Sequence, residues 1–477
     1  MVNLIGTRLQ RPVDAGDSCH FGSTAGAKEL PLWQKTATDP ARRRRAMATY
    51  TSLAHIVAMA AQAATSIATV RLTLPYLGEE RFGIWMTVMG ITGLLTFADL
   101  GIGNALVARV AAARADAAGV PLHVAITGGL ACLFVVGAAV SLATATASAV
   151  IPWGWFFGHQ ISSGLEAEFR QSAVVLGGLF GAFLFTSGLR KVYEGLQQGY
   201  TAHAAMAISS CSSLALLAFA ASQHRGIPVL IAVTFGVTAM LPIALLLPLI
   251  SRGYFRGGSI RSARQHEWRH LLGAGSQYSV VQVGSLLLTG SEPILVSGIQ
   301  GPAALGELAV VQRMFQLAIT PIRVLVAPYW GAYADAHARR DHGYIRRTLI
   351  QQVALAGIST LVIAAAVTWC SDWIMAVWTK GAMAAGSRLI VACCVLCMLD
   401  GAMLPFGIYL NGVGCVRPQA MATAFALFTY FPAKILGLAY GGVEWMIWTT
   451  IAFQVGNTLL FYAVLYREQV WHAIRSR

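Results

Sequence analysis

Apolar runs long enough to cross a lipid bilayer dominate this sequence, with short polar turns between them. A transmembrane α-helix needs about 20 mostly apolar residues, because each residue advances the helix by about 1.5 Å. Hydrophobic residues make up 56% of the 477 residues and charged residues only 11%, whereas soluble domains carry about 25% charged residues. We therefore predict an all-α polytopic membrane protein with about twelve transmembrane helices. The predicted spans cover residues 49–74, 84–108, 123–150, 171–189, 203–222 and 227–250, followed by 271–297, 305–329, 348–376, 387–410, 419–439 and 443–465.

Basic residues are distributed unevenly around these spans. If the N-terminus is cytoplasmic, the cytoplasmic segments hold 25 Lys and Arg residues and the outer loops hold five. Cytoplasmic loops carry such an excess, so we predict that both termini are cytoplasmic. The net charge of +14 then reflects topology. No aromatic-interleaved basic face or RNA motif indicates nucleic-acid binding.

The longest basic loop lies midway along the chain and divides it into two halves of six spans each. An even number of spans gives both halves one orientation, as in parallel repeats. The first residues are polar and lack an apolar core of signal-peptide length, and Met47 would also serve as a start. The predicted parts are a disordered cytoplasmic tail (1–45), a first lobe (46–250), a basic inter-lobe loop (251–270), a second lobe (271–466) and a C-terminal cytoplasmic tail (467–477).

Two glycine pairs with the same spacing mark corresponding places in the two halves. Gly78 and Gly83 lie between the first two spans, and Gly301 and Gly306 lie between the seventh and eighth. We interpret both pairs as polar hairpins on the periplasmic side. Asp99 lies within the second span, so the first pair belongs to a helix hairpin that contains an embedded acid.

Several ionisable residues fall within the predicted spans, where a charge costs about 2.5–3.5 kcal/mol on insertion scales. Such residues usually face a cavity or a partner, so we predict a cationic substrate cavity and a set of acids for coupling or gating. The alternatives are structural salt bridges, or snorkelling to the membrane interface for the residues in the outer thirds of spans. The cationic residues are Arg71, Arg313, Arg323 and Lys434, and the acids are Asp99, Asp400 and Glu292.

Three short motifs carry little weight here. His266-Glu267-x-x-His270 fits the zinc-binding HExxH pattern, but it lies in an Arg-rich loop with no evident third ligand. Cys394 and Cys397 form an isolated CxxC in an apolar run, where thiols behave as small hydrophobes. No GxxxxGK[ST] sequence is present, so the chain has no P-loop for ATP. We expect no cofactor, no metal and no catalytic residue, and we predict that the chain is not an enzyme.

The stretch around the first glycine pair resembles the Wzx-type polysaccharide-exporter flippases of the multidrug/oligosaccharidyl-lipid/polysaccharide exporter superfamily. The residues that carry the resemblance are Leu77-Gly78, Phe82-Gly83, Trp85, Asp99-Leu100-Gly101 and Arg109. The resemblance implies a two-lobed, V-shaped, MATE-like transporter in the bacterial inner membrane that opens alternately to either side. Its substrate would be an undecaprenyl-pyrophosphate-linked oligosaccharide, flipped to the periplasmic leaflet for O-antigen, capsule or exopolysaccharide synthesis, and Arg71, Arg313, Arg323 and Lys434 would line its cationic lumen.

The driving force would be an H⁺ or Na⁺ gradient or consumption of the substrate, and a polysaccharide polymerase and export machinery would be partners. Two alternatives remain open. A multidrug or metabolite cation antiporter of the related extrusion group would favour a more acidic cavity. A zinc-dependent intramembrane protease would use His266 and His270.

Overall fold

The chain forms two compact units, Met1–Ala46 and Met47–Arg477, and the second is described here. Every regular element among the described residues is helical, which confirms the all-α prediction. The division of the second unit into two six-helix lobes stays a prediction. The computed structural model describes residues 40–95, 99, 101–114, 120–157, 161–255, 268, 286–326, 329–338, 341–413 and 416–465.

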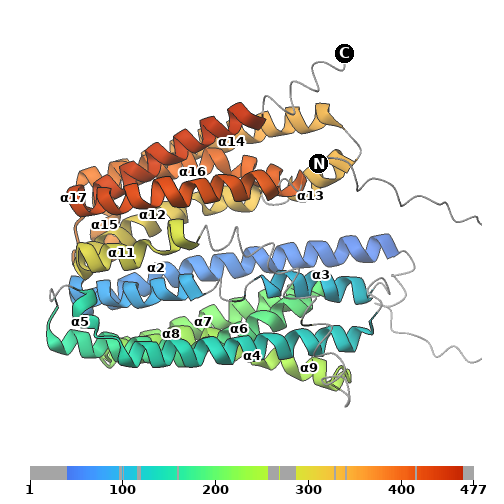
Figure 1. Ribbon diagram of the computed structural model, residues 1–477, viewed down its shortest axis with the longest axis horizontal. Coiled ribbons are helices and arrows are strands. Elements are labelled where there is room, and N and C mark those ends of the chain that lie inside the picture. The colour runs from blue at the N-terminus through green and yellow to red at the C-terminus, as the bar shows by residue number, and fades with distance from the viewer. Residues whose placement is uncertain are drawn as a thin grey trace, which may run out of the picture. The chain divides into compact units, whose positions relative to one another are not determined.

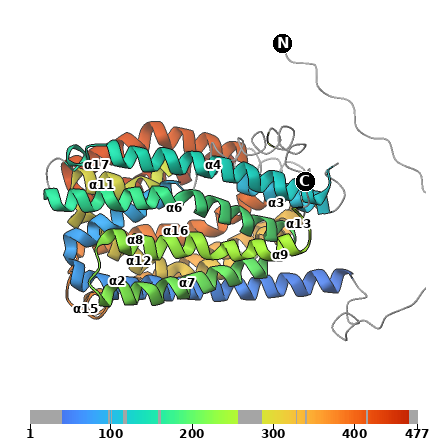
Figure 2. The ribbon, with the colours of Figure 1, turned by 90° about the horizontal axis from the view of Figure 1, so that it is seen from below.

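The helices of the two halves are arranged as two neighbouring groups (Figure 1). The long helices run in roughly one direction (Figure 2), as expected for membrane spans. The first half contains α2 (Pro40–Leu95), α3 (Ile102–Arg114), α4 (Leu122–Val150), α5 (Trp153–Phe156), α6 (Ser163–Gly195), α7 (Gly199–Ser222), α8 (Ile227–Met240), η2 (Leu241–Leu245) and α9 (Leu246–Ser251). The second half contains η3 (Leu286–Gly290), α11 (Glu292–Ile299), α12 (Pro302–Val326), α13 (Tyr329–Ala338), α14 (His342–Trp369), α15 (Ser371–Thr379), α16 (Ser387–Val413) and α17 (Val416–Leu465).

Nine helices among the described residues are long and apolar enough to cross a membrane. Two of them each contain a pair of predicted spans, because Tyr50–Gly93 and Thr423–Asn457 continue through a kink. The predicted span 271–297 lies mostly outside the described residues. The nine helices therefore accommodate eleven of the twelve predicted spans.

The first turn is tighter than predicted. Only Gly78 departs from helical geometry, with φ +75°, and the chain is helical again from Glu79. Glycine reaches this left-handed region without a Cβ penalty, so one residue is enough to redirect the helix. The predicted hairpin Gly78–Gly83 is therefore a single-residue kink followed by helix, and Gly442, with φ +76°, kinks α17 in the same way.

The predicted second span, 84–108, is not one continuous helix. α2 ends at Leu95 and α3 begins at Ile102. Gly101 before α3 has φ +72°, a conformation that interrupts the helical hydrogen-bond ladder. Broken helices occur at membrane depth where side chains or other protein groups satisfy the freed backbone.

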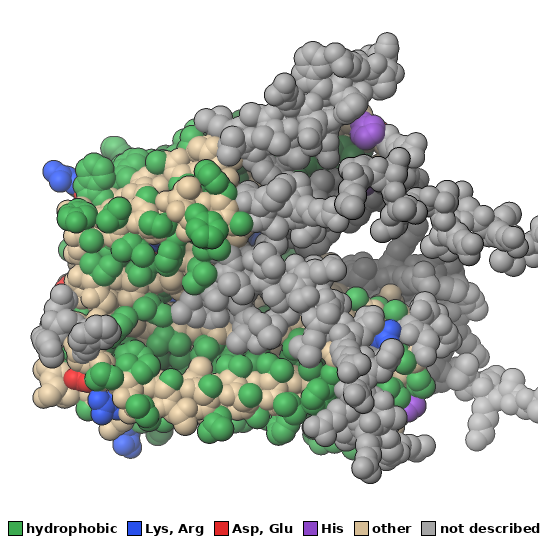
Figure 3. Space-filling model, in the orientation of Figure 1, with side chains coloured by type: hydrophobic (Ala, Val, Ile, Leu, Met, Phe, Trp, Pro, Cys, Tyr) green, Lys and Arg blue, Asp and Glu red, His purple; other side chains and the backbone are tan. Residues whose placement is uncertain are grey.

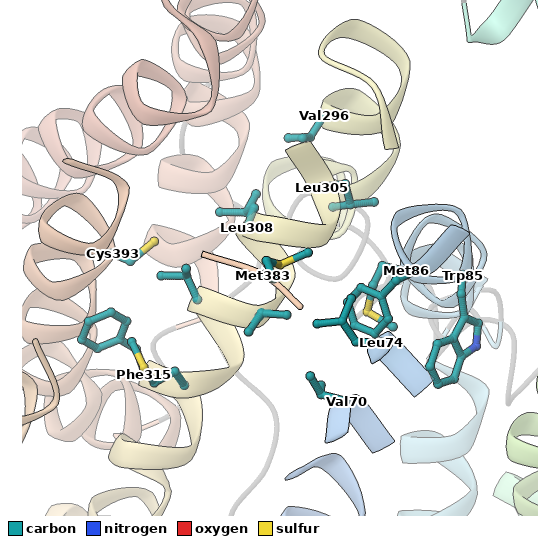
Figure 4. Packing of buried hydrophobic residues seen from close by; sticks show 14 of the residues in the cluster. Val70, Leu74, Trp85, Met86, Val296, Leu305, Leu308, Phe315, Met383 and Cys393 are labelled. Atoms are coloured by element: carbon teal, nitrogen blue, oxygen red, sulfur yellow. The ribbon is translucent and has the colours of Figure 1, made fainter. Parts of the chain in front are cut away.

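The largest buried apolar cluster joins residues from both halves of the chain. Val70, Leu74 and Met86 of α2 lie across from Leu305 and Leu308 of α12 (Figure 4). The most extensive helix packing, by contrast, pairs α4 with α6, α14 with α16, and α6 with α8, each within one half. The helix α2 thus provides a packed connection between two internally packed groups.

Many large apolar side chains point outward. Hydrophobic side chains cover much of the face shown in Figure 3, and most of the visible charged side chains lie toward the ends of the helices. Trp369, Phe428 and Tyr440 are each more than 80% exposed. Exposed apolar surface of this extent requires a lipid environment. The protein is therefore a multi-pass membrane protein.

Candidate functional site

A buried ion pair occupies the second half of the chain. Lys434 of α17 is fully buried, and its Nζ lies 2.5 Å from Oε1 of Glu292 at the start of α11. The other carboxylate oxygen accepts a hydrogen bond from Nε2 of Gln312 on α12, at 3.1 Å. The ring of Tyr430, one turn before Lys434, lies 5.5 Å from the ammonium. Lys434 therefore does not snorkel to the interface but pairs within the helix bundle.

The backbone before Glu292 is shaped to support this pair. Residues Leu286–Gly290 form a single π-helical turn, in which the carbonyl of residue i pairs with the N–H of residue i+5. For Leu288 that position is Pro293, which has no N–H. The Leu288 carbonyl instead accepts a hydrogen bond from Lys434 Nζ at 2.7 Å. Lys434 thus joins three helical segments of the second half.

Arg313 follows Gln312 on α12 and has a buried nitrogen atom, Nη1, without a hydrogen-bond partner in the described part of the chain. A buried charge without a partner is strongly unfavourable, and ionisable residues inside membrane proteins commonly mark substrate pathways. A guanidinium binds carboxylate and phosphate oxygens through paired N–H groups. The local chemistry therefore suits an anionic ligand.

Asp400 and Arg323 lie on neighbouring helices of the same half. The Asp400 carboxylate accepts a hydrogen bond from Nε2 of Gln454 on α17 at 2.9 Å. Arg323 in the last turn of α12 is exposed, and its positive charge electrostatically favours the ionised form of Asp400. Five of the seven predicted site residues thus lie on helices of the second half: Glu292, Arg313, Arg323, Asp400 and Lys434.

Asp99 lies elsewhere, in the break between α2 and α3. Its two carboxylate oxygens accept hydrogen bonds from the backbone N–H groups of Gly101 at 3.0 Å and Gly103 at 3.3 Å. The carboxylate therefore caps the N-terminus of α3 and also complements its helix dipole. A Cβ on Gly103 would lie 2.9 Å from the carboxylate and 3.5 Å from Lys191 Cγ. The absence of a side chain at Gly103 lets these groups approach.

Arg71 also lies apart from the second-half group. The guanidinium Nη1 donates a hydrogen bond to the carbonyl of Val377 in α15, at 2.6 Å. Its side chain lines a cavity of about 370 Å³ bounded by α2, α12, α14 and α15. Arg71 therefore joins helices from the two halves of the chain.

The model of a known family covers more than half of the chain. Residues 46–330 match the family described as polysaccharide biosynthesis protein. The chain belongs to this family. The match includes both glycine pairs, Asp99, Glu292 and Arg313. No curated protein matches the chain closely enough to add to this result.

Solved structures with this fold are transporters of the MOP superfamily. An inward-facing multidrug resistance MATE family transporter has a TM-score of 0.69 at 15% identity, over 87% of this chain and 99% of that one. An outward-facing structure gives 0.63 at 16% identity, covering 94% and 98%. A MOP superfamily transporter from Pyrococcus furiosus Vc1 (DSM3638) gives 0.62 at 16%, also covering 94% and 98%. At these identities the likeness shows the fold alone, and it confirms the prediction of a MATE-like architecture.

Uncharged polar residues of the site escaped the sequence analysis, which considered only ionisable groups in the spans. Gln312 and Gln454 each hold a predicted acid. Tyr430 hydrogen-bonds Thr450 at 2.7 Å and stacks on Phe453 with ring centroids 4.6 Å apart. Amide side chains inside apolar spans carry a desolvation cost, so a search for them would have found both glutamines.

The candidate zinc motif falls outside the described residues, apart from Trp268 within it, whose indole N–H donates to the Gly128 carbonyl at 3.1 Å. A second histidine pair was not predicted. Nδ1 of His55 on α2 lies 3.4 Å from Nδ1 of His203 on α7. Within the described part of the chain, no group of three or more His, Cys, Asp or Glu side chains could hold a metal ion.

Proposed function

We propose that this protein is a flippase that moves an undecaprenyl-pyrophosphate-linked oligosaccharide between the two leaflets of the membrane by alternating access. The observation that carries the proposal is the buried Nη1 atom of Arg313, which has no hydrogen-bond partner in the described part of the chain. A pyrophosphate offers several anionic oxygens to such a group. Membership of the polysaccharide biosynthesis family supports a glycan as the rest of the substrate.

The charge balance of the site favours an anionic substrate over a cationic one. Both oxygens of Glu292 are already occupied, by Lys434 and Gln312, so this acid is not free to bind a cationic drug. Arg313 Nη1, by contrast, has no hydrogen-bond partner among the described residues. The P. furiosus structure is described as having a binding pocket of reversed polarity that suggests a different function, and we propose that pocket polarity likewise separates this chain from cation antiporters of the same fold.

The remaining parts of the proposal follow from charge and topology. The excess of basic residues on one side favours cytoplasmic termini in a bacterial inner membrane. The direction of transport would then be from the cytoplasmic to the periplasmic leaflet, toward a polysaccharide polymerase. Protonation or Na⁺ binding at Asp400, or protonation of Glu292 or Asp99, would couple transport to an ion gradient.

The proposal is tested in a deletion strain complemented by variants. Loss of the protein should cause lipid-linked oligosaccharide to accumulate on the inner leaflet, and the parent sequence should clear it. Arg313→Ala should fail to clear it at equal protein abundance. Arg346→Ala, which removes an exposed arginine near the start of α14, is the matched control and should behave as the parent. Clearance by Arg313→Ala at the parent rate would contradict the proposed role of this residue.

A further inference from the structure

The two glycine pairs, Gly78–Gly83 and Gly301–Gly306, contact each other through corresponding residues in both directions, although one contact is much closer than the other. A Cβ on Gly83 would lie only 1.7 Å from the carbonyl oxygen of Pro302, the residue after Gly301. A Cβ on Gly306 would lie 3.2 Å from the carbonyl oxygen of Glu79, the residue after Gly78. In each pair, therefore, the second glycine packs against a backbone carbonyl of the other pair. That carbonyl belongs to the residue directly after the other pair's first glycine. Gly78 and Gly301 both have positive φ, +75° and +94°.

The contact continues along one face of α2. Residues 83, 87 and 90 share this face because their spacing follows the helical repeat. The hydroxyl of Thr87 hydrogen-bonds that of Ser297 in α11 at 2.7 Å, and both side chains are fully buried. A Cβ on Gly90 would lie 2.4 Å from Cβ of Pro293. The first and second halves of the chain thus meet at this end of the helices with no room for an added methyl group.

Two reciprocal hydrogen bonds join the same halves beside this seam. Arg71 Nη1 of α2 donates to the Val377 carbonyl of α15 at 2.6 Å. Trp378 Nε1 of α15 donates to the Ile67 carbonyl of α2 at 2.7 Å. Val377 lies in the last turn of α15, where carbonyls have no partner within the helix. Each helix therefore supplies one side-chain donor and one backbone acceptor to the other.

We propose that Arg71 and Trp378 form a gate latch that holds this end of the transport pathway closed. Alternating access needs a contact between the halves that is complete in one state and absent in the other. The glycine seam supplies a close backbone contact that any separation of the halves would break. The two hydrogen bonds add a modest, reversible stabilisation. The cavity of about 370 Å³ bordered by Arg71, Trp373 and Trp378 gives both donors space to withdraw.

The gate is independent of the proposed substrate, because any transporter with alternating access must close one end. It also gives Arg71 a role different from the cavity-lining one predicted from sequence. In the closed state its guanidinium is engaged by a backbone carbonyl. The Nη1 atom of Arg71 becomes available to other acceptors when the latch opens.

The latch is tested by the accessibility of a cysteine placed in the seam. Ser297→Cys introduces a thiol at a fully buried position. The reaction of this thiol with a water-soluble maleimide is measured on the purified full-length protein in detergent. The labelling of the same protein without Ser297→Cys, which reports the native cysteines, is subtracted. Trp378→Phe removes the indole donor but keeps an aromatic ring, and Arg71→Met removes the guanidinium donor at an exposed position without disturbing the core.

Each variant should raise the labelling rate about tenfold, equivalent to ~1.4 kcal/mol, which is the scale of one hydrogen bond. The matched control is Trp373→Phe, an exposed tryptophan that lines the same cavity. It should label at the parent rate. Labelling of both Trp378→Phe and Arg71→Met at the rate of Trp373→Phe would overturn the proposal.

Discussion

Removal of Lys434 provides the sharpest test of the buried ion pair. In Lys434→Met the Glu292 carboxylate keeps its hydrogen bond from Gln312 but loses the ammonium that lies 2.5 Å away. Breaking a buried pair by removing one partner costs about 3–5 kcal/mol. An unfolding entropy of about 2.1 cal/mol/K per residue corresponds to about 0.9 kcal/mol per degree for the unit Met47–Arg477. The midpoint of thermal unfolding should therefore fall by about 3–5 °C.

The double variant Lys434→Met with Glu292→Gln separates charge from packing. Replacing both members of a buried pair by neutral side chains is often close to neutral for stability, so we expect the double variant to recover most of the lost midpoint. The assay is the fraction of detergent-solubilised protein that remains monodisperse after heating to a series of temperatures. A Lys434→Met protein as stable as the parent, or a double variant as unstable as Lys434→Met, would refute the reasoning.

Three further predictions concern other parts of the structure. Gly83→Ala should abolish transport, because its Cβ would lie 1.7 Å from the Pro302 carbonyl oxygen, whereas Gly93→Ala, with no atom within 4 Å of the added Cβ, should not; equal transport by both would contradict the seam. Burial raises the pKa of Tyr333 to about 12, and the buried Tyr333 hydroxyl has no hydrogen-bond partner among the described residues. Because an unsatisfied buried group costs about 1–3 kcal/mol, Tyr333→Phe should keep or raise the midpoint of thermal unfolding. Asp99→Ala should lose about 0.5–2 kcal/mol of stability as a helix cap, while Asp99→Asn retains most of it; equal midpoints for the two would show that capping is not the structural role of Asp99.

Much of the architecture could be predicted because it depends on local composition. Apolar length located most of the spans, and exposed residues such as Phe428 and Trp369 carry the lipid-facing surface that the composition implied. The kinks were harder to predict. A glycine between apolar runs indicates a turn, but only the backbone shows that Gly78 bends the helix alone, with φ +75°, rather than opening a loop.

Ionisable residues within the spans could be selected from the sequence, but the groups that they contact could not be predicted, and their role in a transport site stays a prediction. The energetic cost of placing a charge in the membrane singled out Lys434 and Glu292. Their pairing, however, joins positions 142 residues apart and depends on the packing of α17 against α11 and η3. Asp99 carried a local signal that could have been read, because a short acidic side chain just before a helix commonly caps its N-terminal N–H groups. The contact of Arg71 with α15 had no such signal, because its acceptor is a backbone carbonyl.

The most direct test of the account is transfer of substrate by the purified protein in liposomes. A fluorescent polyprenyl-pyrophosphate-linked oligosaccharide is incorporated in both leaflets, and the fraction reached by an added impermeant quencher is followed over time. The account predicts that the parent protein makes the inner-leaflet pool accessible and that Arg313→Ala, at equal reconstitution, does not. Transfer by Arg313→Ala at the parent rate, or no transfer by the parent in the presence of a proton or sodium gradient, would contradict it.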